Sequence, residues 1–275
     1  MERAYELDDG LYVLTSWIPV PTIGLLPANA FLVNAERPYL VDTGVLTEGE
    51  AFVREVEAVI DPAELELIYL THTDPDHIGA LLPLLELAPR AKVITTFIAV
   101  AKLQLGLRAL PPDRIHLLNP GAQIDLGDRT LVAMAPPVFD SPETTMVYDS
   151  RLDALFSADC FGGPQQAPVM LANELSEERL AGSQRLWAAV DAPWIHSIDR
   201  DRFDAQLAEL DRLDPAWVLS SHLPPARAMT STLCRNLGSA PDAPPFVGPD
   251  QPAFEEILKA AALAAATPVP TPPMA

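Results

Sequence analysis

Two imidazoles and two carboxylates lie within six consecutive positions of the chain, in the segment His-Thr-Asp-Pro-Asp-His at residues 72–77. His72, Asp74 and Asp76 alternate, so in an extended segment their side chains point to one side. Imidazole and carboxylate groups bind divalent metal ions, whose charge offsets the cost of bringing carboxylates together. The alternative is a plain loop in which Asp74 or Asp76 caps a helix that begins near His77. The segment favours a metal site over such a loop.

The 72–77 segment stands between two predicted elements. A buried strand is predicted at residues 66–70, and an apolar helical pattern follows at residues 78–88. Ligands of α/β folds gather at the carboxyl ends of strands. The segment therefore lies where such a fold positions functional side chains.

Short apolar runs alternate with helical patterns along most of the chain. The predicted strands cover residues 10–18, 29–35, 38–44, 66–70, 91–96, 114–118, 123–127, 129–135, 145–149, 153–159 and 216–222. The predicted helices cover residues 49–60, 78–88, 97–107, the region near 175–190, 201–213 and 251–266. Two halves of strands then helices indicate an α/β (α+β) fold with two packed sheets covered by helices. We expect one domain over residues 1–250, a helix over 251–266 and a disordered Pro-rich tail over 267–275.

The composition excludes several classes of partner. The 18 Lys and Arg residues against 38 Asp and Glu residues give a formal net charge of −20, which repels phosphate backbones and anionic lipid. We therefore expect neither nucleic acid nor a membrane as a partner. Cys160 and Cys234 are too few for a disulfide framework, and the N-terminal segment has no apolar signal core. These features predict a cytoplasmic protein.

The 72–77 segment resembles the metal loop of the metallo-β-lactamase superfamily, which reads His-x-His-x-Asp-His. Other landmarks follow in the order expected of that superfamily. Val-Asp-Thr-Gly, which ends at Gly44, precedes the loop, Asp159 in Leu-Phe-Ser-Ala-Asp-Cys stands where the family has a metal-bridging aspartate, and His222 stands at its last histidine. The resemblance covers roughly residues 10–225. It implies a four-layer αββα sandwich with a metal site along one edge between the sheets.

Within that superfamily the closer likeness is to flavodiiron proteins and related oxygen-binding diiron proteins. Those proteins have an acidic residue at the place of Asp74, and segments similar to residues 139–149 and to the sequence around Asp159. This chain departs from them in two respects. Asp140 stands where the family has a histidine, and too few residues follow the start of the last helix for the flavodoxin domain of full flavodiiron proteins. We therefore expect no bound flavin and a separate electron-donor protein.

Carried over by position, the resemblance implies two metal ions joined by Asp159. The two implied ligand sets are His72, Asp74, Asp140 and Asp159 for one ion, and Asp76, His77, Asp159 and His222 for the other. The four carboxylates cancel the charge of two divalent ions, so the site should be a weaker Lewis acid than a histidine-rich hydrolase site. Its oxygen-rich coordination favours iron or manganese, with zinc as the alternative.

Other residues near the predicted site have supporting or structural expectations. Asp42 is expected to orient the metal loop without binding metal, with a plain turn-forming residue as the alternative. Glu143 is expected to be a solvated loop carboxylate, or a replacement ligand for Asp140 if the loop shifts. Structural or surface roles are expected for the remaining candidates, His116, His196 and Cys160.

Two functional hypotheses and one non-enzymatic alternative follow. The first is non-haem metal chemistry with O₂ or NO, as reduction or as reversible sensing. The second is metal-dependent hydrolysis of a small ester, thioester, lactone or phosphoester. The third is a superfamily member whose site has decayed to one metal or none. No side chain is predicted to react by itself, and the sequence leaves the small-molecule substrate and the oligomeric state open, a homodimer included.

Overall fold

The computed structural model describes residues 1–266 in two units. The first unit is Met1–Pro244, and the second begins at Pro245. The second unit contains α7 (Gln251–Ala266). The tail predicted over residues 267–275 lies outside the described residues.

The first sheet has the strand order β1-β2-β3-β4-β5-β6-β7. Its strands are β1 (Tyr5–Asp8), β2 (Leu11–Val20), β3 (Gly24–Val33), β4 (Tyr39–Val41), β5 (Leu67–Tyr69), β6 (Lys92–Thr95) and β7 (Ile115–Leu117). The strands from β1 to β4 pair antiparallel, and those from β4 to β7 pair parallel. The carboxyl ends of β4 and β5 therefore share one edge of the sheet, where the 72–77 segment begins.

The second sheet has the strand order β13-β12-β11-β10-β9-β8. Its strands are β8 (Gln123–Asp125), β9 (Thr130–Met134), β10 (Met146–Asp149), β11 (Ala154–Phe156), β12 (Trp217–Leu219) and β13 (Ala226–Arg227). Only the pair β11 and β12 is parallel among these strands. Asp159 and His222, which follow β11 and β12, consequently leave the sheet from the same edge.

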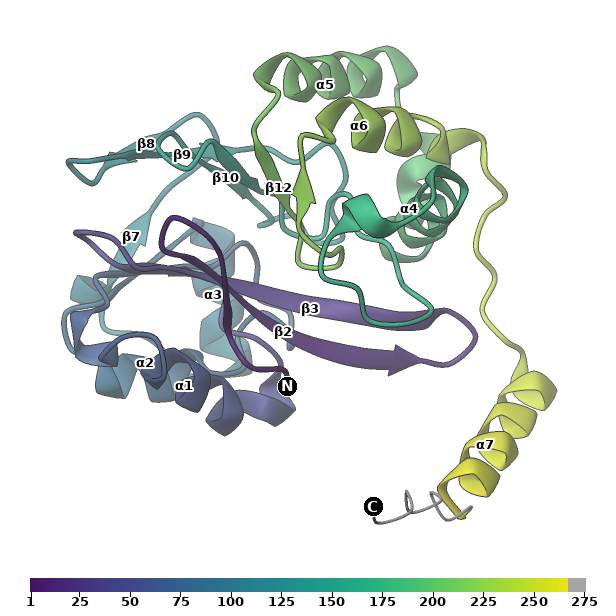
Figure 1. Cartoon of the computed structure of the whole chain (residues 1–275), viewed down its shortest axis with the longest axis horizontal. Helices are drawn as coiled ribbons and strands as arrows, with labels where there is room; N and C mark the ends of the chain where they lie inside the picture. The colour runs from purple at the N-terminus through teal and green to yellow at the C-terminus, as the bar shows by residue number, and fades with distance from the viewer. Residues whose placement is uncertain (267–275) are drawn as a thin grey trace, which may run out of the picture. The chain divides into compact units, whose positions relative to one another are not determined.

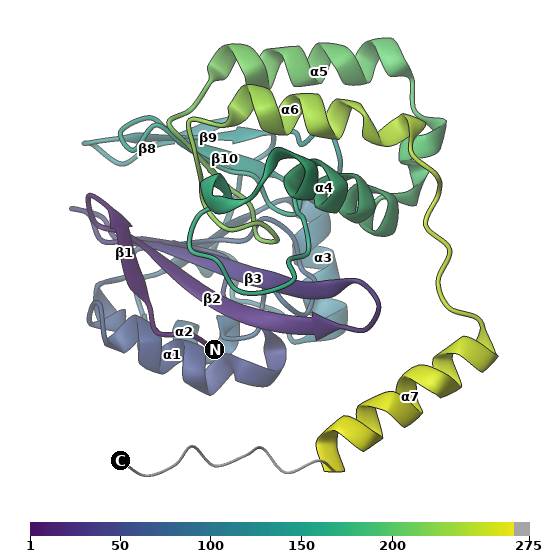
Figure 2. The ribbon, with the colours of Figure 1, turned by 45° about the vertical axis from the view of Figure 1, so that its right-hand side comes forward.

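Helices cover the outer face of each sheet (Figures 1 and 2). The helices α1 (Gly49–Glu57), α2 (Leu81–Leu87) and α3 (Phe97–Gly106) belong to the first half, and α4 (Glu177–Asp191), α5 (Arg200–Leu213) and α6 (Thr230–Gly238) to the second. Short 3₁₀ helices occupy connections at Leu46–Glu48, Pro62–Glu64, Pro112–Arg114, Ala172–Glu174, Pro193–Ser197 and Ala240–Asp242. The predicted αββα sandwich is confirmed. Within residues 1–266, no helix combines the length and the apolar character needed to cross a membrane.

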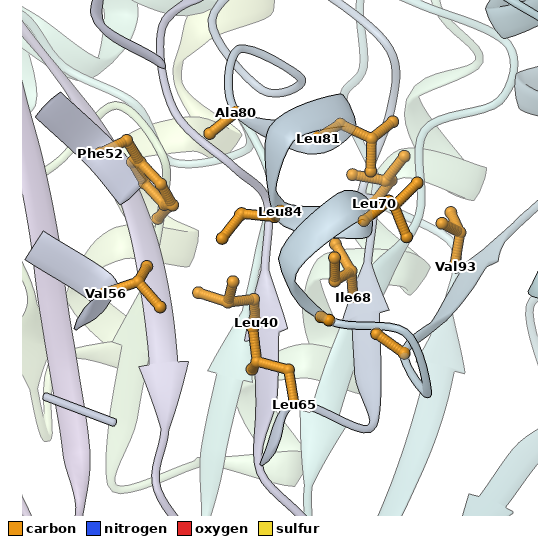
Figure 3. Packing of buried hydrophobic residues seen from close by; sticks show 14 of the residues in the cluster. Leu40, Phe52, Val56, Leu65, Ile68, Leu70, Ala80, Leu81, Leu84 and Val93 are labelled. Carbon is orange, nitrogen blue, oxygen red and sulfur yellow. The ribbon is translucent and has the colours of Figure 1, made fainter. Parts of the chain in front are cut away.

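Apolar side chains fill the spaces between these layers. Figure 3 shows Phe52 and Val56 of α1 and Leu84 of α2 beside Leu40 and Ile68 of the first sheet. A second cluster lies under α4, α5 and α6, and a third joins the two sheets. Each fully buried side chain of this size contributes about 1.5–3 kcal/mol. This packing fixes the strand ends from which the metal loop and its partners emerge.

Apart from the short 3₁₀ helices, the sequence did not predict β1, β13 and α6. The α6 segment begins Thr-Ser-Thr, which has low intrinsic helix propensity. Its Leu233 and Leu237 are buried against the second half of the protein, so tertiary packing outweighs the propensity. The strand β1 lies at the edge of its sheet and alternates half-buried with exposed residues, which gives only a weak strand signal.

The β2–β3 hairpin is also longer than predicted, because β3 begins at Gly24 and continues through Pro27. Of the residues of β3, only Phe31–Val33 pair with β4. The earlier part of β3 therefore has one edge unpaired by the first sheet, where a proline is tolerated. This edge leaves the Pro27 carbonyl available to the loop that carries His222.

Candidate metal centre

Asp42, directly after β4, holds the start of the metal loop. Its Oδ1 accepts a hydrogen bond from Thr71 N at 2.8 Å, and its Oδ2 accepts one from Thr71 Oγ1 at 2.7 Å. Oδ2 also lies 2.9 Å from His77 Nδ1. The φ angle of Asp42 is 60°, in the left-handed region that aspartate tolerates better than most residues. Both oxygens of Asp42 are thus engaged with the loop.

The two histidines of the loop face Asp159. His77 Nε2 lies 3.2 Å from Asp159 Oδ1, and His72 Nε2 lies 3.4 Å from Asp159 Oδ2. The two imidazole rings are 3.8 Å apart between centroids. Because Asp42 engages Nδ1 of His77, the Nε2 atom is the one directed at the carboxylate. This is the arrangement by which proteins orient metal-binding imidazoles.

Asp159 stands in a tight turn after β11. Ala158 before it has a φ angle of 52°, and the carbonyl oxygen of Ala158 accepts hydrogen bonds from Ser221 N at 2.8 Å and Ser220 Oγ at 3.1 Å. The turn after β11 is therefore tied to the turn after β12. These hydrogen bonds bring Asp159 and His222 close together at the shared edge of β11 and β12.

His222 is held by the unpaired edge of β3. Its Nδ1 lies 2.8 Å from the carbonyl oxygen of Pro27, which can only accept, so the ring donates there and presents Nε2 to the carboxylates. Nε2 lies 3.2 Å from Asp159 Oδ1 and 3.4 Å from Asp76 Oδ2. Asn29 of β3 donates to the carbonyl oxygens of Ser220 and Leu223 on either side. We call His77 and His222, both buried, the enclosed side of the centre.

Asp74 and Asp140 form the open side of the centre. The side chain of Asp74 is 41% exposed, and Asp140 is exposed. Asp74 Oδ1 lies 3.7 Å from Lys102 Nζ, and Asp140 Oδ1 accepts a long hydrogen bond of 3.4 Å from Thr144 Oγ1. Both carboxylates nonetheless group with buried His72 through ligand-capable atoms within 4.8 Å of one another.

Glu143 is not a solvated carboxylate, and that expectation is wrong. It is 1% exposed, and Lys102 Nζ lies 2.5 Å from its Oε1. Thr73 Oγ1 and Ser141 Oγ also donate to its oxygens, at 2.9 and 2.6 Å. Burial alone would raise the pKa of Glu143, but the hydrogen bonds from Lys102 and Ser141 hold it below the ordinary value. Its oxygens are taken up by these neighbours, so it supports the loops instead of replacing Asp140.

All seven residues predicted to bind metal are brought together. Their ligand-capable atoms fall into four overlapping groups, each with all atoms within 4.8 Å: His72, His77 and Asp159; Asp76, His77 and His222; His72, Asp74 and Asp140; and Asp140, Asp159 and Asp191. Asp159 is common to two of the groups and lies between the enclosed and open sides. The assignment of each residue as a ligand stays a prediction.

Unpaired buried atoms test whether this set suits metal ions. His72 Nε2, His77 Nε2 and Asp159 Oδ1 are buried and have no hydrogen-bond partner among the described residues. An unpaired buried polar atom is costly. A cation between these atoms would satisfy all three and offset the charge of the carboxylates. The donor set therefore fits metal ions.

The pKa values of the clustered side chains are shifted by burial and by the close approach of the carboxylates and imidazoles. Burial would raise the pKa of Asp159, but His222, His72 and His77 hold it well below the ordinary range. Burial would lower the pKa of His77, but the neighbouring carboxylates, Asp159 first, raise it well above its ordinary value. On the open side, burial and the nearby carboxylates raise the pKa of Asp140.

Asp191 is the one member of the cluster that the sequence did not indicate. It is the last residue of α4 and groups with Asp140 and Asp159. Burial, together with the Asp159 carboxylate, raises its pKa to about 8. Its position depends on how α4 packs on the second sheet, so no local motif marks it. An acidic residue at a helix C-terminus, where the helix dipole disfavours it, is the only signal in the sequence.

The remaining sequence candidates lie apart from the four groups. His116 is exposed on β7, and His196 Nδ1 lies 3.3 Å from the carbonyl oxygen of Pro241. Cys160 is 3% exposed within the core under the second-half helices. None of these three residues belongs to the groups described above, and their positions agree with the structural or surface roles expected for them.

Residues 26–200, more than half of the chain, match the family described as ODP family beta lactamase. The chain belongs to this family. The matched range includes the 72–77 segment, Asp140, Asp159 and Asp191. His222 lies beyond it, so the evidence for that residue's position is the geometry described above.

Curated relatives of this ODP family protein are larger flavoproteins. The putative diflavin flavoprotein A 2 of Nostoc sp. is 30% identical over 135 residues, which are 49% of this chain and 23% of that protein. The anaerobic nitric oxide reductase flavorubredoxin of Klebsiella pneumoniae is 27% identical over 168 residues, which are 60% of this chain and 35% of that protein. The similarity thus spans only 23–35% of these relatives.

Solved structures similar to this ODP family protein include flavodiiron proteins. Rubredoxin oxygen:oxidoreductase from Desulfovibrio gigas superposes with a TM-score of 0.76 at 19% identity, over 88% of this chain and 62% of that chain. A fragment of the putative diflavin flavoprotein A 5 from Nostoc sp. gives a TM-score of 0.70 at 17% identity, over 87% of this chain and 96% of the fragment. At these identities the likeness establishes the shared fold.

Proposed function

We propose that the clustered carboxylates and imidazoles hold two iron ions, and that the loaded protein binds and reduces O₂ or NO. The observation that carries this proposal is the convergence of His72 Nε2, His77 Nε2 and Asp159 Oδ1, three buried atoms without hydrogen-bond partners among the described residues. Similar proteins support the choice of gas, because they include a nitric oxide reductase flavorubredoxin and a rubredoxin oxygen:oxidoreductase. The choice of iron is supported by a similar solved structure from Thermotoga maritima that is described as a flavo di-iron protein.

The chemistry of the donors favours iron over zinc. The proposed ligands are His72, Asp74, Asp140 and Asp159 for one ion, and Asp76, His77, Asp159 and His222 for the other. Carboxylate oxygens outnumber imidazole nitrogens in this set, and oxygen-rich sites suit iron or manganese better than zinc. Iron held by these residues would supply one-electron chemistry toward a diatomic molecule.

The side chains of the enclosed side and those of the open side have different roles in this proposal. On the enclosed side, the Nδ1 contacts with Asp42 and with the Pro27 carbonyl direct the Nε2 atoms of His77 and His222 into the centre. Burial of both rings excludes water from that side. On the open side, the exposed carboxylates of Asp74 and Asp140 leave an approach for a small molecule and for protons.

Turnover also consumes electrons, which the ligand side chains do not supply. We propose that a separate donor protein delivers them. The identity of that donor does not enter the test below, because a chemical reductant can replace it.

Metal analysis followed by rapid mixing tests the proposal. Protein purified without added metal should contain about two metal ions per chain, with iron enriched over zinc. After anaerobic loading with Fe²⁺ and reduction, mixing with O₂ or NO should change the absorbance spectrum, and continued gas consumption should require excess reductant. Zinc-loaded protein is the matched control and should consume neither gas.

Two results would overturn the proposal. Stoichiometric zinc without iron, combined with turnover of a generic ester, lactone or phosphodiester, would assign the centre to hydrolysis instead. A well-folded protein that binds neither metal would show that the site has lost its metals altogether.

A further inference from the structure

Asp191 brings a fifth carboxylate to the centre, from an element outside the predicted ligand sets. One of its oxygens lies within 4.8 Å of ligand-capable oxygens of Asp140 and Asp159. We propose that Asp191 is a metal ligand on the open side, beside Asp140, which stands where the family resemblance expects a histidine. This inference rests on the proposed function in one respect, since it requires that metal occupies the centre.

The packing of α4 directs this residue toward the centre. Trp187 precedes Asp191 by four residues, so the two side chains lie on the same side of the helix. The Trp187 ring is 4.7 Å from the His222 ring between centroids. Gly162 permits this close approach, because a Cβ atom there would lie 2.4 Å from the Trp187 ring. The face of α4 that carries Asp191 is therefore the one that packs on the metal centre.

A second contact fixes the Asp140 loop against the end of α4. Trp194, three residues after Asp191, donates from Nε1 to the carbonyl oxygen of Phe139 at 2.9 Å. The two aromatic rings also pack, with centroids 5.1 Å apart. Phe139 directly precedes Asp140, so the Phe139–Trp194 pair holds Asp140 next to Asp191.

Without a cation, the position of Asp191 is electrostatically unfavourable. It stands at the negative end of the α4 dipole, and the last turn of that helix has no basic residue. Two other carboxylates are its neighbours. Among the described residues, no hydrogen bond or ion pair to the Asp191 side chain offsets these unfavourable contacts. Proteins tolerate such placements mainly where function requires them.

An independent feature of the open side points to a cation. His72 Nε2 is buried and has no hydrogen-bond partner among the described residues. It faces Asp159 Oδ2 at 3.4 Å, and it also groups with Asp140. A metal ion held by Asp140, Asp159 and Asp191 beside His72 would give this buried nitrogen a partner.

The extra carboxylate has a chemical consequence for the iron pair. With Asp191 the centre has five carboxylates, one more than the charge of two Fe²⁺ ions balances. Additional negative charge stabilises the more positive, oxidised ions. Asp191 should therefore lower the Fe³⁺/Fe²⁺ midpoint potential of the open-side iron and make the reduced protein a better electron donor to its bound gas.

The test compares Asp191→Asn with the wild type and with Asp201→Asn. The asparagine preserves shape but removes the charge. Asp201 is an exposed residue of α5, so its variant makes the same chemical change away from the centre. Chelator competition should show at least ~10-fold weaker binding of one iron in Asp191→Asn, with the other iron unchanged. Its midpoint potential should rise, whereas Asp201→Asn should match the wild type in both measurements.

Thermal unfolding of the metal-free proteins guards against a folding defect. Removing a carboxylate from the negative end of a helix should leave the Tm of metal-free Asp191→Asn equal to or above that of the wild type, while the iron-loaded variant gains less Tm from metal. Asp191→Ala, which has no donor atom at all, should weaken the same iron further.

The outcomes separate this inference from the proposed function. If Asp191→Asn and Asp191→Ala bind two irons as tightly as the wild type, with unchanged potentials, Asp191 is not a ligand and the proposed function stands. If the wild type itself binds no iron, the proposed function fails first and this inference fails with it.

Discussion

The enclosed and open sides of the centre differ in burial and in how firmly their side chains are held. His77 and His222 are 1% and 2% exposed, and each is fixed through Nδ1 by a contact of 2.9 or 2.8 Å. The side chain of Asp74 is 41% exposed, and its one ion pair among the described residues is a 3.7 Å contact with Lys102. Asp140 is exposed and holds one 3.4 Å hydrogen bond.

This difference predicts unequal metal affinity within one centre. Ligands that are already held in place lose little conformational freedom on binding metal, and their supporting bonds raise affinity by 10–100-fold. The enclosed side should therefore keep its ion when a chelator removes the other. The open side should be where gas and protons enter, because Asp74 and Asp140 are its solvent-exposed carboxylates.

The largest effect is expected from Asp159→Ala, which removes the carboxylate between the two sides. Both proposed ions lose a ligand, and three imidazoles lose the charge that faces them. Metal content should fall from about two ions per chain to well below one. Elemental analysis after gel filtration measures this. If one ion per chain is retained at full affinity, Asp159 does not join the two sides.

Asp140→Ala should have about half that effect, because it removes a ligand from the open side alone. We expect about one ion per chain after dialysis, with the enclosed-side ion retained. Asp140→His should restore about two ions, and it should shift the preference toward zinc because an imidazole replaces a carboxylate. Competition between Fe²⁺ and Zn²⁺ measures the shift. Two ions bound by Asp140→Ala with wild-type affinity would mean that Asp140 is not a ligand.

Some residues of the centre could be predicted from local sequence patterns, whereas others could not. The 72–77 segment is local, so alternation and residue type were enough to indicate a metal site and its place at a strand end. Asp159 and His222 are distant in the chain, and only the family resemblance pointed to them. What holds His222, the Pro27 carbonyl, depends on an unpaired strand edge that no local pattern reveals.

On the open side, the roles of Glu143 and Asp191 depend on tertiary packing and could not be predicted from the sequence. Glu143 resembles any loop glutamate in the sequence, but α3 brings Lys102 to it, and the buried carboxylate pairs with this partly exposed ammonium group. Asp191 ends an ordinary helix, and only the packing of Trp187 on His222 brings it to the centre. The periodicity of strands and helices predicted the layers. The contacts of Lys102 with Glu143 and of Trp187 with His222 depend on how the helices pack on the sheets, which this periodicity does not encode.

Asp42→Asn should weaken the enclosed side without unfolding the loop. Asparagine tolerates the positive φ of 60° at this position and still offers an oxygen to Thr71. Its amide, however, would donate to His77 Nδ1 and place the imidazole proton on Nε2, the atom that faces the centre. We expect ~10–100-fold weaker binding of the enclosed-side ion. Metal titration with Asp201→Asn as the control measures it, and an equal loss on both sides would contradict the division.

The smallest effect is expected from Glu143→Gln, which tests what supports the open side. The variant keeps hydrogen-bonding atoms for Thr73 and Ser141 but loses the charge that faces Lys102. Because Lys102 is 39% exposed, solvent screens the pair, and we expect the free energy of unfolding of the metal-free protein to fall by about 1 kcal/mol at pH 7.

The pH dependence of that difference follows from the pKa of Glu143, which the fold holds below the ordinary glutamate value of 4.5. A carboxyl group with a lowered pKa stabilises the folded state fully above its ordinary pKa, and this stabilisation is lost as the pH falls through the folded value. The gap in unfolding free energy between wild type and Glu143→Gln should therefore be constant from pH 7 to about pH 5 and shrink below 4.5.

Urea unfolding at a series of pH values measures the gap, with Glu209→Gln on the exposed face of α5 as the control. A gap that stays constant down to pH 3 would mean that the charge of Glu143 contributes nothing, and that the open side is held by Ser141 and Thr73 alone.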